Sequence, residues 1–140
     1  MTNDSLSRMS LTEISGAIAK REVSSKEVVQ NTLELLENQG NSLNCVARLF
    51  TENALNDAEL ADQELSNGNS RGILHGVPLT HKDMFYRKGE ITGCGSKICE
   101  NYIPSVTATA LVKLDSSGAL DIGRLNMVEF AYGLTGHNEI

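Results

Sequence analysis

Two stretches near the start of the chain combine a polar start signal with apolar residues at helical spacing. Ser10 and Glu13 have the spacing of a capping box, in which the two side chains satisfy the free N–H groups of a helix start. Ser24 and Glu27 repeat this signal. The apolar positions behind the two starts are Leu11, Ile14, Ala17 and Ile18, then Val29, Leu33 and Leu36, with a stop near Gly40. The pattern predicts a helical layer over about residues 10–40.

Beyond that layer, short apolar runs alternate with helical patterns. Strands are predicted over residues 43–50, 77–82 and 119–122. Between the first two strands, Thr51 is expected to cap a helix. That helix presents one face of small and apolar residues, namely Ala54, Ala58, Ala61 and Leu65. The small side chains predict close packing of this helix on a sheet.

A further helix is predicted over Thr107 to Ser117, with the Thr107 hydroxyl as its cap and Gly118 just past its end. Residues 126–132 form a predicted turn or short helix. Strands that alternate with helices indicate an α/β fold with a mixed sheet.

Composition sets only broad limits. The chain has 140 residues, a net charge of −6 and a pI near 5.0, which argues against direct nucleic-acid binding. No apolar run approaches the roughly 18 residues needed to span a bilayer, and the N-terminus lacks a signal-peptide pattern. We therefore expect a cytoplasmic protein that does not enter membranes. Cys45, Cys94 and Cys99 are odd in number and irregular in spacing, which favours three reduced thiols.

Lys82 stands at the end of the second predicted strand, directly before Asp83. Burial on such a strand lowers the pKa of a lysine from its ordinary value near 10.4 by roughly 3–5 units, which gives an amine able to act as a base near neutral pH. The plain alternative is a solvated pair of charges at a strand edge. On alternating strand faces, Asp83 points away from Lys82, so the amine is expected to be free for another partner.

Three motifs resemble those of the amidase signature family. Residues 74–83 resemble the segment written H-G-[IV]-P-x-x-x-K-D, and residues 93–96 resemble the following T-x-x-G-S loop. Residues 118–133 are similar to G-A-x-x-x-G-x-[TL]-N-M-x-E-F-A-x-G. The motifs occur in the family's order, and the resemblance covers nearly the whole chain, most weakly before residue 45. It implies an amidase-signature-type mixed β-sheet flanked by helices, of which residues 1–140 form the N-terminal portion of a single domain.

The family uses a Ser–cis-Ser–Lys triad to hydrolyse or transfer amides, and Lys82 occupies the position of its lysine base. Both serines belong to a Gly-Gly-Ser-Ser-Gly-Gly-Ser segment, and no Gly-Gly-Ser-Ser run occurs in the 140 residues. The resemblance therefore implies a piece of an amidase that is inactive alone. It also implies a small-molecule amide as substrate, no cofactor, and other amidotransferase subunits as partners if the enzyme is of that type.

The resemblance suggests roles for two more residues. Ser96 lies in the glycine loop and is expected to support Lys82 by hydrogen bonding, although an ordinary turn serine fits the same position. Met127 is expected near the substrate pocket, although methionine is more often a core residue. In the family pattern, Asp-Ala-Thr often precedes the Gly-Ala strand, whereas here the sequence reads Thr-Ala-Thr from Thr107.

Two other functions compete with the enzyme. The first is a noncatalytic interaction module that docks on another subunit. It would use the sheet edge and apolar face left exposed in a partial fold, which also predicts self-association. The second is a small zinc domain built on His75, His81, Cys94 and Cys99, although these spacings match no standard zinc pattern.

Overall fold

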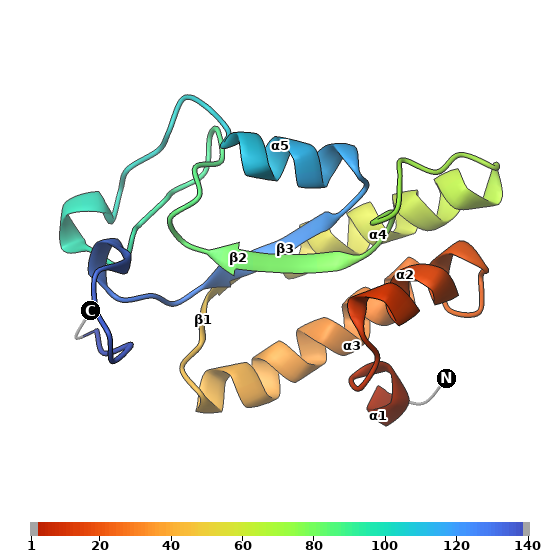
Figure 1. Ribbon diagram of the computed structural model, residues 1–140, viewed down its shortest axis with the longest axis horizontal. Helices are drawn as coiled ribbons and strands as arrows, with labels where there is room; N and C mark the ends of the chain where they lie inside the picture. Colours follow the sequence, from red (N-terminus) through yellow and green to blue (C-terminus); the bar gives the residue numbers. More distant parts are fainter. Residues whose placement is uncertain (1–2, 139–140) are drawn as a thin grey trace.

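The computed structural model describes residues 3–138, which form an α/β structure around a three-stranded sheet (Figure 1). Its elements, in chain order, are α1 (Asn3–Leu6), α2 (Leu11–Ala19), α3 (Ser25–Leu35), the π-helical turn η1 (Leu36–Gly40), β1 (Val46–Leu49), α4 (Thr51–Ser66), β2 (Pro78–Lys82), the 3-10 turn η2 (Lys97–Cys99), α5 (Thr109–Ser116), β3 (Leu120–Leu125) and the 3-10 turn η3 (Glu129–Ala131). None of the helices among these residues is long and apolar enough to cross a membrane.

The sheet is mixed, as the alternating pattern predicts. Its strand order is β1-β3-β2, with β1 antiparallel and β2 parallel to the central strand β3. A parallel pair needs a crossover connection, and α5 lies within the one that joins β2 to β3. In Figure 1, α5 lies above the strands, whereas α2 and α3 lie below them.

The apolar stripes found in the sequence form the core on the side of α3 and α4. Val29 and Leu33 of α3, Ala58 of α4 and Ile122 of β3 belong to one buried cluster. Ala58 and Ile122 are completely buried, so the small side chains of α4 do allow close approach to the central strand. A second cluster joins α1, α2 and the start of α3 to Val77, just before β2.

Two of the predicted helix caps are confirmed and two are wrong. Ser10 and Ser24 form complete capping boxes at α2 and α3. The predicted cap Thr51 is instead the first residue of α4, behind Phe50, which forms no side-chain cap. Thr107 also does not cap α5, which begins at Thr109, because its hydroxyl accepts a hydrogen bond from the Lys88 N–H (3.1 Å).

These caps give a direct stability test. Replacing Ser24 by alanine removes the side-chain cap of α3 and is expected to lower the free energy of unfolding by about 1 kcal/mol. The hydrogen bonds that Ser24 makes through its N–H and hydroxyl also lower the pKa of Glu27, so this helix start favours the ionised carboxylate. The matched control is Thr51→Ala, which removes no cap and is expected to change stability by less than about 0.5 kcal/mol. Urea unfolding of both variants measures the difference, and equal losses would contradict the assignment.

The first strand is shorter than predicted. Residues 41–45 continue the turn after η1, and Asn44 has φ 50°, outside the extended region. Leu43, expected inside the strand, is 74% exposed. The strand starts only at Val46, because the N–H groups of Asn44 and Cys45 bond back to residues 40 and 41 rather than to β3.

Candidate functional site

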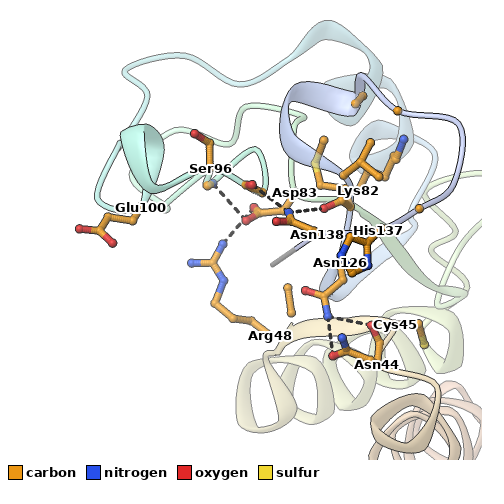
Figure 2. Close-up of a pocket in the computed structure, with 18 of the residues that line it drawn as sticks. Asn44, Cys45, Arg48, Lys82, Asp83, Ser96, Glu100, Asn126, His137 and Asn138 are labelled. Carbon is orange, nitrogen blue, oxygen red and sulfur yellow. Dashed lines mark hydrogen bonds and ion pairs between the residues drawn. The ribbon is translucent and has the colours of Figure 1, made fainter. Parts of the chain in front are cut away.

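A cavity of about 700 Å³ opens at the end of β2 (Figure 2). Four segments far apart in the sequence line it, namely parts of residues 43–48, 82–83, 91–100 and 126–138. The three residues that the sequence singles out, Lys82, Ser96 and Met127, all lie in its wall. The fold therefore gathers the predicted site residues around a single cavity, whereas their individual roles stay predictions.

Lys82 ends β2 and is exposed, whereas Val77 at the entrance to this strand is buried. The expectation that Lys82 is carried on a buried strand is therefore wrong. The physical reason is its position: β2 is an edge strand, and its last residue opens onto the cavity. Lys82 lines the cavity, and among residues 3–138 no side chain pairs with its ammonium group.

Asp83 binds other groups than Lys82, as the alternation of strand faces predicts. Its Oδ1 accepts a hydrogen bond from Arg48 Nη2 (3.1 Å), and its Oδ2 accepts one from the Gly93 N–H (3.0 Å). Arg48 Nη2 also donates to the Ile91 carbonyl (2.8 Å). Figure 2 shows Asp83 between Arg48 and the loop that carries Ser96. This carboxylate thus ties β1 and the glycine loop to the end of the lysine strand.

Arg48 is a site residue that the sequence analysis missed. It lies within the short strand β1, between apolar neighbours, and its side chain is only 34% exposed. A lone arginine inside an apolar strand was the available signal, because a buried guanidinium needs a partner.

Ser96 is nearly buried at 3% exposure, and its hydroxyl is already engaged. It donates to Glu129 Oε1 (2.6 Å) and accepts from the Ile98 N–H (3.2 Å). Among residues 3–138 these are the hydrogen bonds of the Ser96 hydroxyl, and the expected direct hydrogen bond to Lys82 is not formed in this structure. Ser96 instead joins the glycine loop to the η3 turn.

Met127 fits both of its predicted roles in part. It is 7% exposed, as a core residue would be, yet it lines the cavity. Its carbonyl accepts a hydrogen bond from Asn138 Nδ2 (2.8 Å), which also donates to the Gly95 carbonyl (2.9 Å). Asn138 therefore connects two walls of the cavity, a link that no local sequence signal predicts. Contact between Met127 and substrate remains a prediction.

The glycine loop requires glycine at one position in particular. Gly95 has φ 60°, and a Cβ there would lie 2.7 Å from the Met127 carbonyl oxygen and 2.8 Å from Asn138 Nδ2. Replacing Gly95 by alanine is therefore expected to lower the free energy of unfolding by about 1–3 kcal/mol. Gly16→Ala in α2 is the matched control: its Cβ meets nothing within 4 Å, and the change should stabilise the helix by up to about 1 kcal/mol. Thermal or urea unfolding distinguishes the two signs, and a neutral Gly95→Ala would remove the packing constraint on this loop.

A buried cluster of charges lies behind the lysine strand. Arg124 is 1% exposed, and its Nη1 donates to Asp121 Oδ1 (2.6 Å). Arg87 Nε lies 2.6 Å and His81 Nε2 3.4 Å from Asp121 Oδ2, as ion-pair contacts without the angles of directed hydrogen bonds. Burial disfavours the charge on Asp121, but His81 and the two guanidinium groups outweigh it and hold its pKa below the ordinary value. Because His81 also contacts the Lys82 carbonyl through Nδ1 (3.0 Å), this cluster supports the backbone of the catalytic candidate.

The histidines proposed as zinc ligands have other partners. His75 is 6% exposed, its Nδ1 accepts from the Arg71 N–H (3.1 Å), and its Nε2 lies 2.9 Å from the Ala61 carbonyl. His75 thus fixes the turn into β2, and His81 belongs to the charge cluster. Within residues 3–138, no three side chains of His, Cys, Asp or Glu are arranged to hold a metal ion.

Comparison with known proteins gives a consistent result. The sequence profile of the family named Amidase matches residues 27–140. A subunit of the glutamyl-tRNA(Gln) amidotransferase of Bdellovibrio bacteriovorus is 44% identical over 124 residues, which is 89% of this chain and 25% of that protein. Among solved structures, an amidase aligns with a TM-score of 0.85 at 34% identity over 94% of this chain and 30% of its own. A fatty acid amide hydrolase aligns with a TM-score of 0.92 at 27% identity, over 99% and 25%. The chain thus spans about a quarter of the length of the curated relatives it matches.

Proposed function

Because the chain belongs to the amidase family, we propose that the cavity at the end of β2 is part of an active site that hydrolyses or transfers amides. The observation that carries this proposal is the placement of Lys82: its side chain opens onto the cavity without a partner among residues 3–138. A base must reach the proton it removes, and an amine held by a carboxylate could not do so.

The mechanism follows the triad that the family resemblance implies. In this proposal Lys82 accepts a proton from a bridging serine, which in turn accepts the proton of the nucleophilic serine. The nucleophile attacks the amide carbonyl, and backbone N–H groups stabilise the oxyanion. The 140 residues contain no Gly-Gly-Ser-Ser run to supply these serines, so we propose that this segment alone does not cleave amides.

Asp83 and Arg48 have a positioning role in this proposal. Asp83 holds the Gly93 N–H and Arg48 at once, so the glycine loop keeps its place beside Lys82. Because this carboxylate is neutralised by Arg48, it does not compete for the amine of Lys82. Met127, which also lines the cavity, is proposed to contact the substrate.

The choice between hydrolase and amidotransferase rests on the relatives. The Bdellovibrio bacteriovorus amidotransferase protein is 44% identical to the matched part of this chain, which favours a role in transferring amide nitrogen with other subunits. We propose a small carboxamide as substrate in either case. The sheet edges at β1 and β2 are proposed as surfaces through which the isolated segment self-associates.

The test is a chimera in which these residues replace the matching quarter of the Bdellovibrio bacteriovorus relative. Ammonia release from glutamine and from simple carboxamides is measured for the chimera and for the isolated 140 residues. We expect turnover by the chimera and none by the isolated segment. A folded chimera without amide turnover would contradict the enzyme and favour the alternative, a noncatalytic module that docks on another subunit.

A further inference from the structure

Two of the three cysteines, Cys94 and Cys99, lie on the loop that lines one side of the cavity. Cys94 and Cys99 are both partly buried, and neither is in a disulfide. The chain turns back between them, because the Ser96 N–H donates to the Gly93 carbonyl (2.9 Å) and the Cys99 N–H donates to the Ser96 carbonyl (3.0 Å). The φ angles of Cys94 (53°) and Gly95 (60°) are both positive, which tightens this turn.

Backbone hydrogen bonds bring the segments of the two cysteines together, because the Tyr102 N–H donates to the Cys99 carbonyl (2.9 Å) and the N–H of Thr92, two residues before Cys94, donates to the Tyr102 carbonyl (2.9 Å). Burial is the main cause that raises the pKa of the Cys94 thiol, and the charge of Cys99 and a hydrogen bond from its side chain add to it. The pKa of Tyr86 is raised first by its hydrogen bond with Tyr102, and the charges of Cys94 and Cys99 raise it further. The rings of Tyr86 and Tyr102 are 5.4 Å apart. The dithiol therefore lies beside a pair of tyrosines.

The arms of the loop keep the cysteines in this arrangement. The Gly89 N–H donates to the Pro104 carbonyl (3.1 Å), and the Thr92 N–H donates to the Tyr102 carbonyl (2.9 Å). These bonds join the two arms of the loop that carries the cysteines. A disulfide requires that its two Cα atoms lie within about 7 Å of each other, and these hydrogen bonds hold the two arms that carry the cysteines side by side.

We propose that Cys94 and Cys99 form an oxidisable dithiol that closes to an intrachain disulfide when it meets a small-molecule disulfide such as oxidised glutathione. In the first step, one cysteine thiolate attacks a sulfur of glutathione disulfide, forms a mixed disulfide and releases one glutathione thiolate. The other cysteine, as its thiolate, then attacks the protein sulfur of that mixed disulfide and releases the second glutathione. Two protein thiols are oxidised, one glutathione disulfide is reduced to two thiols, and the two protons pass to solvent and the released thiolates.

This crosslink would act on the cavity wall. Ser96, which lies between the two cysteines, and Glu100, which follows Cys99, both line the cavity (Figure 2). The disulfide would lock the loop from Gly93 to Glu100 and so fix one wall of the cavity. Cys45 lies across the cavity at the start of β1 and belongs to a different segment, which makes it the natural control.

The experiment uses the whole 140-residue chain and its Cys45→Ser variant, incubated with oxidised glutathione. In the parent chain, two of the three thiols should be lost, whereas the variant should lose both of its thiols. In each case the mass should fall by two hydrogen atoms, and digestion should yield a peptide that links Cys94 to Cys99. A Cys94→Ser change in the Cys45→Ser variant should stop at a mixed disulfide with one glutathione on Cys99.

Several results would overturn the proposal. The first is the formation of disulfide-linked dimers, and the second is two stable glutathione adducts on the Cys45→Ser variant. The third is that this variant keeps both of its thiols while a reference dithiol peptide is oxidised. Circular dichroism is used to check that the Cys45→Ser variant is folded, so its result counts whether or not the double variant with Cys94→Ser folds. The readout is thiol chemistry and does not depend on amide turnover, so it stands apart from the proposed function.

Discussion

Replacing Lys82 by alanine in the active chimera is expected to lower kcat for amide hydrolysis by about 10²–10⁴-fold, the usual contribution of a general base. KM should change little, because the amine is proposed to act on a proton and not to bind the substrate. Lys82→Arg should be equally impaired, since a guanidinium keeps its charge but cannot give up its proton. Steady-state kinetics of ammonia release measure both variants.

The matched control for this prediction is Lys113→Ala. Lys113 is an exposed lysine of α5 that does not line the cavity, so its removal changes the net charge equally without touching the site. Activity in Lys113→Ala should equal that of the unmodified chimera. If Lys82→Ala keeps its turnover, Lys82 is not the base, and the open position of its side chain at the cavity needs another explanation.

The second large effect is expected at Asp121. Changing Asp121 to asparagine removes the one carboxylate that Arg124 and Arg87 share, and Arg124 is 1% exposed. Arg124 keeps its contact with Glu90 Oε2 (2.5 Å), and Arg87 keeps its two hydrogen bonds to Asp115, so the expected loss is about 1–3 kcal/mol. Urea unfolding at about pH 7 should show a loss of this size. Asp57→Asn on the exposed face of α4 is the control, with a change below about 0.5 kcal/mol.

The effect of Asp121 should depend on pH in a defined direction. The pKa of Asp121 is lowered in the folded state, so its contribution is fully present above the ordinary aspartate value of about 3.9. It is lost as the pH falls through the lowered pKa of the folded protein. The stability difference between the parent and Asp121→Asn should therefore shrink at acid pH, while other carboxylates titrate equally in both proteins. A difference that stays constant on acidification would show that the ionised carboxylate is not the cause.

The structure bears out those parts of the fold that depend on local chemistry. Ser24 caps α3 because a serine hydroxyl three residues before a glutamate can satisfy the same free N–H groups in any protein. Ala58 faces the sheet because helical spacing alone sets which residues share a stripe. The mixed sheet is also correct, since it follows from the alternation of strands and helices.

Two of the wrong predictions concern residues whose partners lie far away in the sequence. Thr107 has the right side chain for a cap but bonds to Lys88, a contact that exists only when the long loop folds back. Ser96 gives its proton to Glu129, 33 residues further along the chain. Local propensity could not decide either case, because a hydroxyl bonds to whichever group the fold brings within reach.

For the candidate site, the sequence by itself determined which residue types are present and in what order: a lysine at a strand end, a glycine loop, and an Asn-Met turn. Only the tertiary structure decided that Lys82 is exposed and that Asp83 pairs with Arg48. The reason is physical: local spacing fixes which face of a helix or strand a side chain occupies. Its burial and its charge partners are fixed by segments that come together only when the sheet and its loops pack.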